Sequence, residues 1–119
     1  MALYTSYYGN MQNIPSHITP IAISSYVPEG INCIWYPEFA PSETMRKNFK
    51  NTGDLTTFRR KYKSLLHRID IIERLEPLLE RDCVFLCFEK NHRMCHRSIF
   101  AEYLGKLLDT DIEEYKLQV

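Results

Sequence analysis

Apolar residues along the chain form short continuous runs. Between these runs, apolar residues recur at the spacing of an α-helix, a pattern typical of an α/β protein. Runs rich in aromatic or β-branched residues predict strands at 3–8 and 20–26. A shorter strand or extended segment is predicted at 31–36, and a final strand at 111–119. The run at 83–88 is apolar throughout, which indicates a strand covered on both faces of a parallel sheet.

Helical spacing of apolar residues fills the intervals between these runs. Ser42 is a predicted N-cap for a helix reaching about residue 50, and Asp54 a predicted N-cap for the next. The second helix carries its apolar face at Leu55, Phe58, Tyr62, Leu65, Leu66 and Ile69. More helix is predicted at 71–79, interrupted near Pro77, and a last helix at 99–108. Alternating strands and helices predict a three-layer domain, with a mostly parallel sheet and helices on both faces.

Composition favours a single globular domain covering residues 1–119. Hydrophobic residues make up 45% of the chain and charged residues 25%, which excludes a disordered protein. No apolar run approaches the ~20 residues of a membrane span, and the first residues lack the features of a signal peptide. We therefore expect a cytoplasmic protein with no membrane partner, whose four cysteines are thiols rather than disulfides.

Charge is balanced overall but unevenly distributed. The formal net charge is zero, yet the segment 46–68 contains many cations and a single acid, Asp54. Its densest part holds Arg59, Arg60, Lys61 and Lys63. Such a stretch is usually a solvated helix face, and the alternative is a surface that binds the phosphates of a nucleic acid.

The densest chemistry lies between the predicted strand at 83–88 and the predicted helix at 99–108. An open α/β sheet binds its ligands at this kind of strand end. The first turn of a helix offers free N–H groups, and the fork of Arg97 suits phosphate or carboxylate. Arg97, Ser98 and Cys87 are therefore predicted to bind an anionic small molecule or a nucleotide.

The same segment contains three candidate catalytic residues. Cys95 lies at or beside the N-cap, where the helix and neighbouring cations lower the pKa of a thiol, so it is a candidate nucleophile. Glu89 is a candidate general acid or base, with the alternative of a structural partner for Arg97. His96, beside Cys95, completes the set.

Two sharper patterns match less well. Cys87, His92, Cys95 and His96 have the ligand types of a zinc site, but no Cys-x2-Cys pair is present. Cys87 and Arg93 have the Cys-x5-Arg spacing of cysteine phosphatases, but the loop between them lacks glycine. The cofactor, if there is one, is not specified by the sequence.

At these residues the chain resembles the domain of unknown function 488 family. The resemblance rests on Cys87-Phe88-Glu89 after an apolar strand and on Cys95-His96-Arg97 opening a helix. It implies the family's α/β fold and a site at Cys87, Glu89, Cys95, His96 and Arg97. It does not imply a reaction, because the family is itself poorly characterised.

Three functions stay open on the sequence alone. The first is a domain that binds a nucleotide or another phosphorylated ligand and acts as an enzyme on it or on nucleic acid. The second is a non-catalytic ligand-sensing or nucleic-acid-associated module. The third is a purely structural Cys-His-Arg motif, in which Arg97 pairs with Glu89 and the thiols pack.

Overall fold

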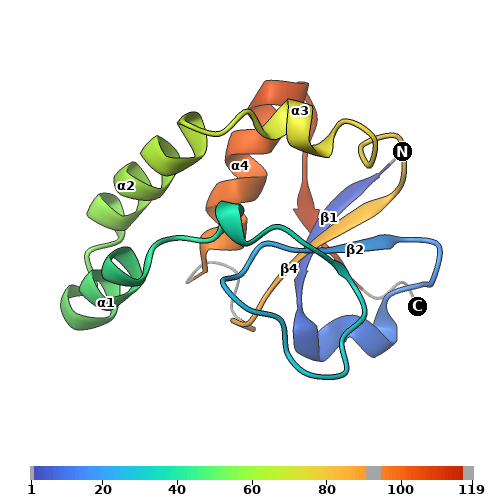
Figure 1. Ribbon diagram of the computed structural model, residues 1–119, viewed down its shortest axis with the longest axis horizontal. Coiled ribbons are helices and arrows are strands. Elements are labelled where there is room, and N and C mark those ends of the chain that lie inside the picture. Colours follow the sequence, from blue (N-terminus) through green and yellow to red (C-terminus); the bar gives the residue numbers. More distant parts are fainter. Residues whose placement is uncertain (1, 91–94, 117–119) are drawn as a thin grey trace.

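The computed structural model describes residues 2–90 and 95–116, which form a five-stranded parallel sheet with α-helices against it (Figure 1). The strands are β1 (Leu3–Tyr7), β2 (Thr19–Ala22), β3 (Ile34–Trp35), β4 (Cys83–Cys87) and β5 (Glu113–Glu114). Their order across the sheet is β3-β2-β4-β1-β5, and every pairing is parallel. The predicted α/β class with a parallel sheet is confirmed.

The central strand is β4, which pairs with β1 on one side and β2 on the other. Cys83 is opposite Leu3 in β1 and opposite Thr19 in β2. All five residues of β4 are buried, which explains why its sequence is apolar without alternation. The loop that follows β4 therefore leaves from the middle of the sheet, at the carboxyl ends of the strands.

Four α-helices form as α1 (Glu43–Thr52), α2 (Leu55–His67), α3 (Ile71–Leu75) and α4 (His96–Leu108). The predicted N-caps are confirmed. The Ser42 hydroxyl accepts a hydrogen bond from the Met45 amide at 3.1 Å, and the Asp54 carboxylate accepts one from the Thr57 amide at 3.1 Å. These contacts satisfy amides that have no partner inside the helix.

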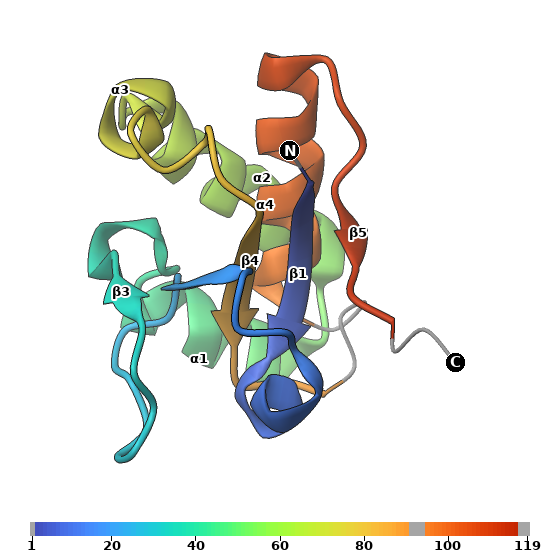
Figure 2. The same cartoon turned by 90° about the vertical axis from the view of Figure 1, so that its right-hand side faces the viewer.

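The α-helices pack against one face of the sheet, with α4 lying beside the central strands (Figure 2). Their buried residues join Ile21, Ile23 and Phe85 in one core. On the opposite face, Ala22, Val84 and Leu86 are covered by the 3-10 helix η1 (Tyr8–Asn13) and by loop residues. Helices were expected on both faces, and on this second face the helix is the 3-10 helix η1 in the connection from β1 to β2.

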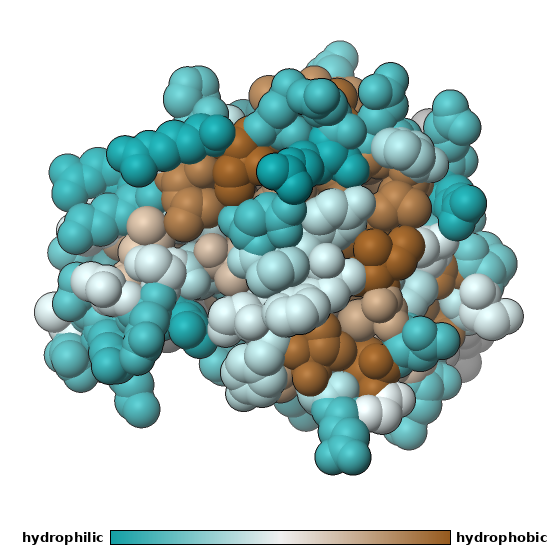
Figure 3. Space-filling view, viewed as in Figure 1, coloured by the Kyte–Doolittle hydropathy of each residue, from teal (hydrophilic) through white to brown (hydrophobic). Residues whose placement is uncertain are grey.

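The strands β2, β3 and β5 are shorter than the runs that predicted them. β2 ends at Ala22, and beyond it the Ser24 hydroxyl donates to the Tyr26 carbonyl at 2.6 Å, closing a turn. A second short 3-10 helix, η2 (Pro37–Phe39), precedes α1. Hydrophilic side chains cover much of the end of the molecule formed by α1 and α2 (Figure 3). Among the helices of the described residues, none has both the length and the apolar character needed to cross a membrane.

Candidate functional site

The candidate site lies where β4 ends and α4 begins. Cys87 is the last residue of β4, and Cys95 is the N-cap of α4, with extended backbone and no side-chain hydrogen bond to the helix. The apolar spacing begins at Ile99, and the helix starts at His96, which confirms the prediction of Cys95 at the N-cap. The first-turn amides of α4, which have no partner inside the helix, therefore lie near the carboxyl end of β4, where an open α/β sheet binds its ligands.

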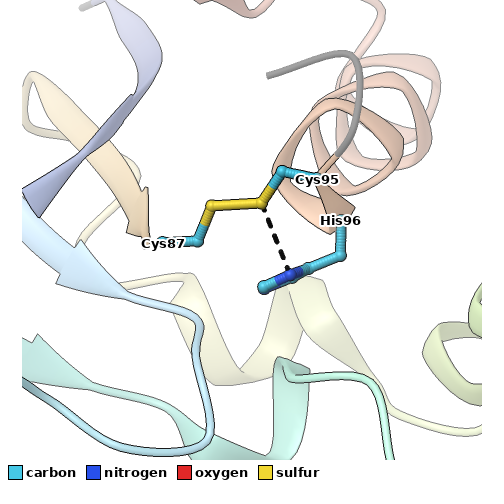
Figure 4. A group of neighbouring side chains, drawn as sticks. All are labelled: Cys87, Cys95 and His96. Atoms are coloured by element: carbon cyan, nitrogen blue, oxygen red, sulfur yellow. Dashed lines mark hydrogen bonds between the residues drawn. A yellow bond between two sulfur atoms is a disulfide. The ribbon is translucent and has the colours of Figure 1, made fainter. Parts of the chain in front are cut away.

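Cys87 and Cys95 are joined by a disulfide, drawn in Figure 4. Four thiols were predicted, so the prediction is wrong for this pair, whereas Cys33 and Cys83 are free. The reason is that the end of β4 lies beside the start of α4, which brings two cysteines eight residues apart together. Composition alone does not contain that information.

His96 lies against both sulfurs with a defined tautomer. Its Nε2 lies 2.8 Å from the carbonyl oxygen of Ile23, and because a carbonyl only accepts, Nε2 carries the proton. Nδ1 therefore holds a lone pair, 3.7 Å from Sγ of Cys95. Burial lowers the pKa of His96 to about 4, outweighing the bond to Ile23 that raises it. The imidazole is thus neutral at pH 7, with the Nδ1 lone pair facing Sγ of Cys95.

Arg97 is fully buried, and each of its five N–H donors has a partner inside the protein. Nε and one terminal nitrogen bind the Glu114 carboxylate at 3.0 and 2.6 Å. The other contacts go to Sγ of Cys87 and to the backbone carbonyls of Glu89 and Lys90. Arg97 was predicted to bind an anionic ligand; in this arrangement an anion reaches it only by displacing Glu114.

The carboxylate partner of Arg97 is Glu114 of β5 and not Glu89. A structural role for the motif predicted that Arg97 pairs with the Glu89 carboxylate. Instead, Arg97 binds only the backbone carbonyl of Glu89, whose side chain is exposed. Glu114 reaches the guanidinium because β5 pairs with β1 beside it. Nothing in the local motif points to a residue 17 positions further along the chain.

A cavity of about 100 Å³ opens beside His96, at the carboxyl ends of β2 and β4. Cys95 and His96 line it together with Glu89, so three candidate catalytic residues share one cavity. The remaining lining residues are Ser24, Ser25, Ala40, Pro41, Arg46 and Phe88. Arg46 and the two serines were not predicted, because α1 and the turn after β2 reach this edge only through the strand order.

Ser98 does not join this group. Its hydroxyl donates to the Cys95 carbonyl at 3.0 Å, and it lines a different cavity with Thr5 and Glu114. The prediction of Ser98 as a ligand-binding residue therefore stays a prediction without support from its position. His92 and Arg93, which entered the zinc and phosphatase alternatives, lie outside the described residues.

The basic stretch in α2 divides into two pairs. Arg59 and Lys63 both contact the Glu102 carboxylate of α4, at 2.5 and 3.0 Å, and tie the two helices together. Arg60 and Lys61 line a shallow cavity of about 270 Å³ with Arg68. Half of the predicted nucleic-acid surface is therefore used in helix packing, and nucleic-acid binding by the rest stays a prediction.

Together these features define a small parallel α/β domain with a Cys/His cluster and a cavity at the carboxyl edge of the sheet. Residues 20–104 match the family model described as Domain of unknown function DUF488. The match covers more than half of the chain, and the protein belongs to this family, as the Cys-Phe-Glu and Cys-His-Arg motifs indicated. No curated protein and no solved structure gives a significant match.

Proposed function

We propose that the domain binds a small anionic ligand, a nucleotide or another phosphorylated molecule, in the cavity beside His96. The observation that carries the proposal is the convergence of Arg46, Ser25 and the start of α4 on this cavity. Arg46 makes no ion pair with any residue in the described part of the chain. A guanidinium that shares a cavity with a helix N-terminus is an arrangement that attracts phosphate.

The size of the cavity limits what part of the ligand it encloses. Pockets that enclose whole drug-sized ligands measure about 300–1,000 Å³, and this one measures about 100 Å³. It suits a phosphate or carboxylate group, with the rest of the ligand outside. A cavity of this volume can enclose one charged group, and the rest of the ligand would contact the surrounding surface.

Exposed aromatic rings beside the cavity favour a ligand with a planar base. Phe88 lines the cavity and is 39% exposed, and Tyr26, 59% exposed, packs against it with ring centroids 4.5 Å apart. Stacking of a nucleobase on an aromatic side chain contributes about 1–3 kcal/mol. A nucleotide with its phosphate in the cavity and its base against Phe88 uses both features.

If the domain acts on its ligand, Glu89 is the best-placed general acid or base. Its carboxylate is exposed at the cavity, whereas His96 is neutral and has one nitrogen committed to Ile23. Cys95 is a nucleophile only when its bond to Cys87 is reduced. Binding without catalysis, as in a ligand-sensing module, uses the same cavity.

The test is the melting temperature of the wild type and two variants, Arg46→Gln and Lys47→Gln, with phosphate, AMP, ADP and ATP. Lys47 is the matched control because it neighbours Arg46 on α1 but pairs with Glu43 at 2.9 Å, away from the cavity. Ligand at a hundred times its Kd stabilises by about 2.7 kcal/mol, a shift of about 10 °C for a domain of this size.

We expect the ligand to raise the melting temperature of the wild type and of Lys47→Gln, but not that of Arg46→Gln. Phe88→Ala separates a nucleotide from a bare phosphate, since it weakens binding of the former only. No shift with any of these ligands, or an equal shift in Arg46→Gln, contradicts the proposal.

A further inference from the structure

Three side chains at the junction of β4 and α4 bring metal-ligand atoms together. Sγ of Cys87, Sγ of Cys95 and a ring nitrogen of His96 all lie within 4.8 Å of one another. Figure 4 shows Cys87 reaching from the end of the strand toward Cys95 and His96 at the start of the helix. Two thiolates and an imidazole are a ligand set that zinc prefers.

The imidazole is oriented as in metal-binding histidines. A ligating histidine almost always donates its other N–H to a carbonyl or carboxylate, which fixes the ring and its tautomer. Here Nε2 of His96 donates to the Ile23 carbonyl at 2.8 Å and leaves the Nδ1 lone pair toward the sulfurs. In the disulfide form neither sulfur carries a proton, so the Nδ1 lone pair has no donor among them.

The surroundings of Cys87 favour an anionic sulfur. The buried guanidinium of Arg97 donates to Sγ of Cys87 at 3.0 Å. A neighbouring cation stabilises the thiolate, the form of cysteine that ligates metals. A disulfide sulfur carries no charge and makes poor use of that donor.

The distance between the donor atoms of His96 and Cys95 is close to that in a tetrahedral site. With Zn–S of about 2.3 Å and Zn–N of about 2.0–2.1 Å, two such ligands lie about 3.5 Å apart, and Nδ1 of His96 lies 3.7 Å from Sγ of Cys95. The Cα atoms of the two cysteines are 7.6 Å apart, wider than the usual disulfide range of about 4.4–6.8 Å. The backbone therefore leaves room for the sulfurs to separate around an ion.

We propose that, once reduced, Cys87 and Cys95 bind a zinc ion together with Nδ1 of His96. Reduction by a dithiol adds two electrons and two protons to the sulfurs, and the dithiol leaves as its own disulfide. Zinc then replaces the two thiol protons, which are released to solvent. With three protein ligands the ion keeps an open position, and because Cys95 and His96 line the cavity with Glu89, that position faces the cavity.

Zinc binding in this form is controlled by the oxidation state of the cysteine pair. The disulfide form has no thiolate to offer, so it does not bind the ion. The inference goes beyond the proposed anion binding and does not depend on it, since Arg46 is not a ligand of the metal.

The experiment titrates Zn²⁺, and Co²⁺ as a coloured substitute, into the full chain after reduction with dithiothreitol and anaerobic removal of the reductant. We expect one ion per chain by native mass spectrometry, and cobalt spectra with thiolate-to-metal charge-transfer absorption. Zinc is also expected to protect Cys87 and Cys95 from alkylation. Protein left oxidised is expected to bind none.

Variants assign the ligands. Cys95→Ser and His96→Gln are each expected to weaken Zn²⁺ binding by more than tenfold, whereas Cys33→Ser, which changes a free cysteine, leaves it unchanged. If Cys95→Ser fails to fold, the comparison of oxidised and reduced wild type still decides. Equal zinc binding by both forms, or a cobalt spectrum without thiolate bands, overturns the proposal.

Arg46→Gln separates this inference from the proposed function. This variant is expected to bind zinc as the wild type does, but its melting temperature is not expected to rise with phosphate. Loss of zinc binding in Arg46→Gln would contradict the assignment of three ligands.

Discussion

Neutralising Glu114 tests whether Arg97 holds the site together. The Glu114 side chain is 17% exposed, and its carboxylate makes a two-point contact with the fully buried Arg97. Its Oε1 also accepts a hydrogen bond from the Thr5 hydroxyl at 2.7 Å. Glu114→Gln keeps the shape and one oxygen acceptor but leaves the guanidinium without an opposite charge.

The expected loss of stability is large because the pair is buried. Removing one partner of a buried ion pair costs about 3–5 kcal/mol, and since the glutamine oxygen still accepts one hydrogen bond, we expect about 3 kcal/mol. A domain is stable by about 5–15 kcal/mol, so most of the variant stays folded. The melting temperature is expected to fall by about 12 °C, from about 4 °C per kcal/mol.

Urea unfolding followed by far-ultraviolet circular dichroism measures the loss directly. Glu113→Gln is the control, because Glu113 is the preceding residue of β5 and its side chain is exposed. It is expected to change the free energy of unfolding by less than about 1 kcal/mol, as exposed charges do. A loss of that small size in Glu114→Gln would refute the view that Arg97 and Glu114 form a buried structural pair.

Three further predictions follow from buried or paired groups. Tyr62→Phe is expected to cost about 1–3 kcal/mol in urea unfolding, because the buried Tyr62 hydroxyl donates to the Phe39 carbonyl at 2.5 Å; Tyr36→Phe, whose hydroxyl contact is exposed, is expected to cost less. Burial raises the pKa of Cys83 to about 11, so iodoacetamide at pH 8 is expected to modify Cys83 only after unfolding; modification of native Cys83 as fast as in urea would contradict this. Hydrogen bonds from Arg59 and Lys63 lower the pKa of Glu102 to about 2, from 4.5. The lowered pKa of Glu102 stabilises the folded state above pH 4.5. That stabilisation is lost as the pH falls through about 2. The free energy of unfolding of Glu102→Gln is thus expected to be lower by less than about 1 kcal/mol at pH 7, because the pair is partly exposed. Near pH 2 no difference from the wild type is expected.

Local signals in the sequence predicted the elements well. Ser42 and Asp54 were recognised as N-caps because capping depends on a side chain and an amide three residues on. The apolar run of β4 predicted its central position, since only a strand covered on both faces lacks alternation. These interactions involve neighbours in the chain, so the sequence contains them.

The contacts that shape the site depend on the strand order, which local patterns do not specify. Arg46 reaches the cavity from α1, and Glu114 reaches Arg97 from β5. Both contacts require β4 to lie between β1 and β2. The motif therefore predicted where the Cys/His cluster lies, but not which cation lines the cavity and which is buried.

The competing roles of Arg97 and Arg46 can be separated with the Glu114→Gln variant. If Arg97 were the anion ligand, phosphate would have to displace the Glu114 carboxylate, because all five donors of Arg97 are occupied. Removing that charge would then relieve the competition, and phosphate would stabilise Glu114→Gln more than the wild type. If Arg46 is the ligand, the shift caused by phosphate is the same in both proteins. We expect equal shifts, because the guanidinium of Arg97 is buried between β4, α4 and β5, whereas Arg46 lines the cavity and has no ion pair among the described residues.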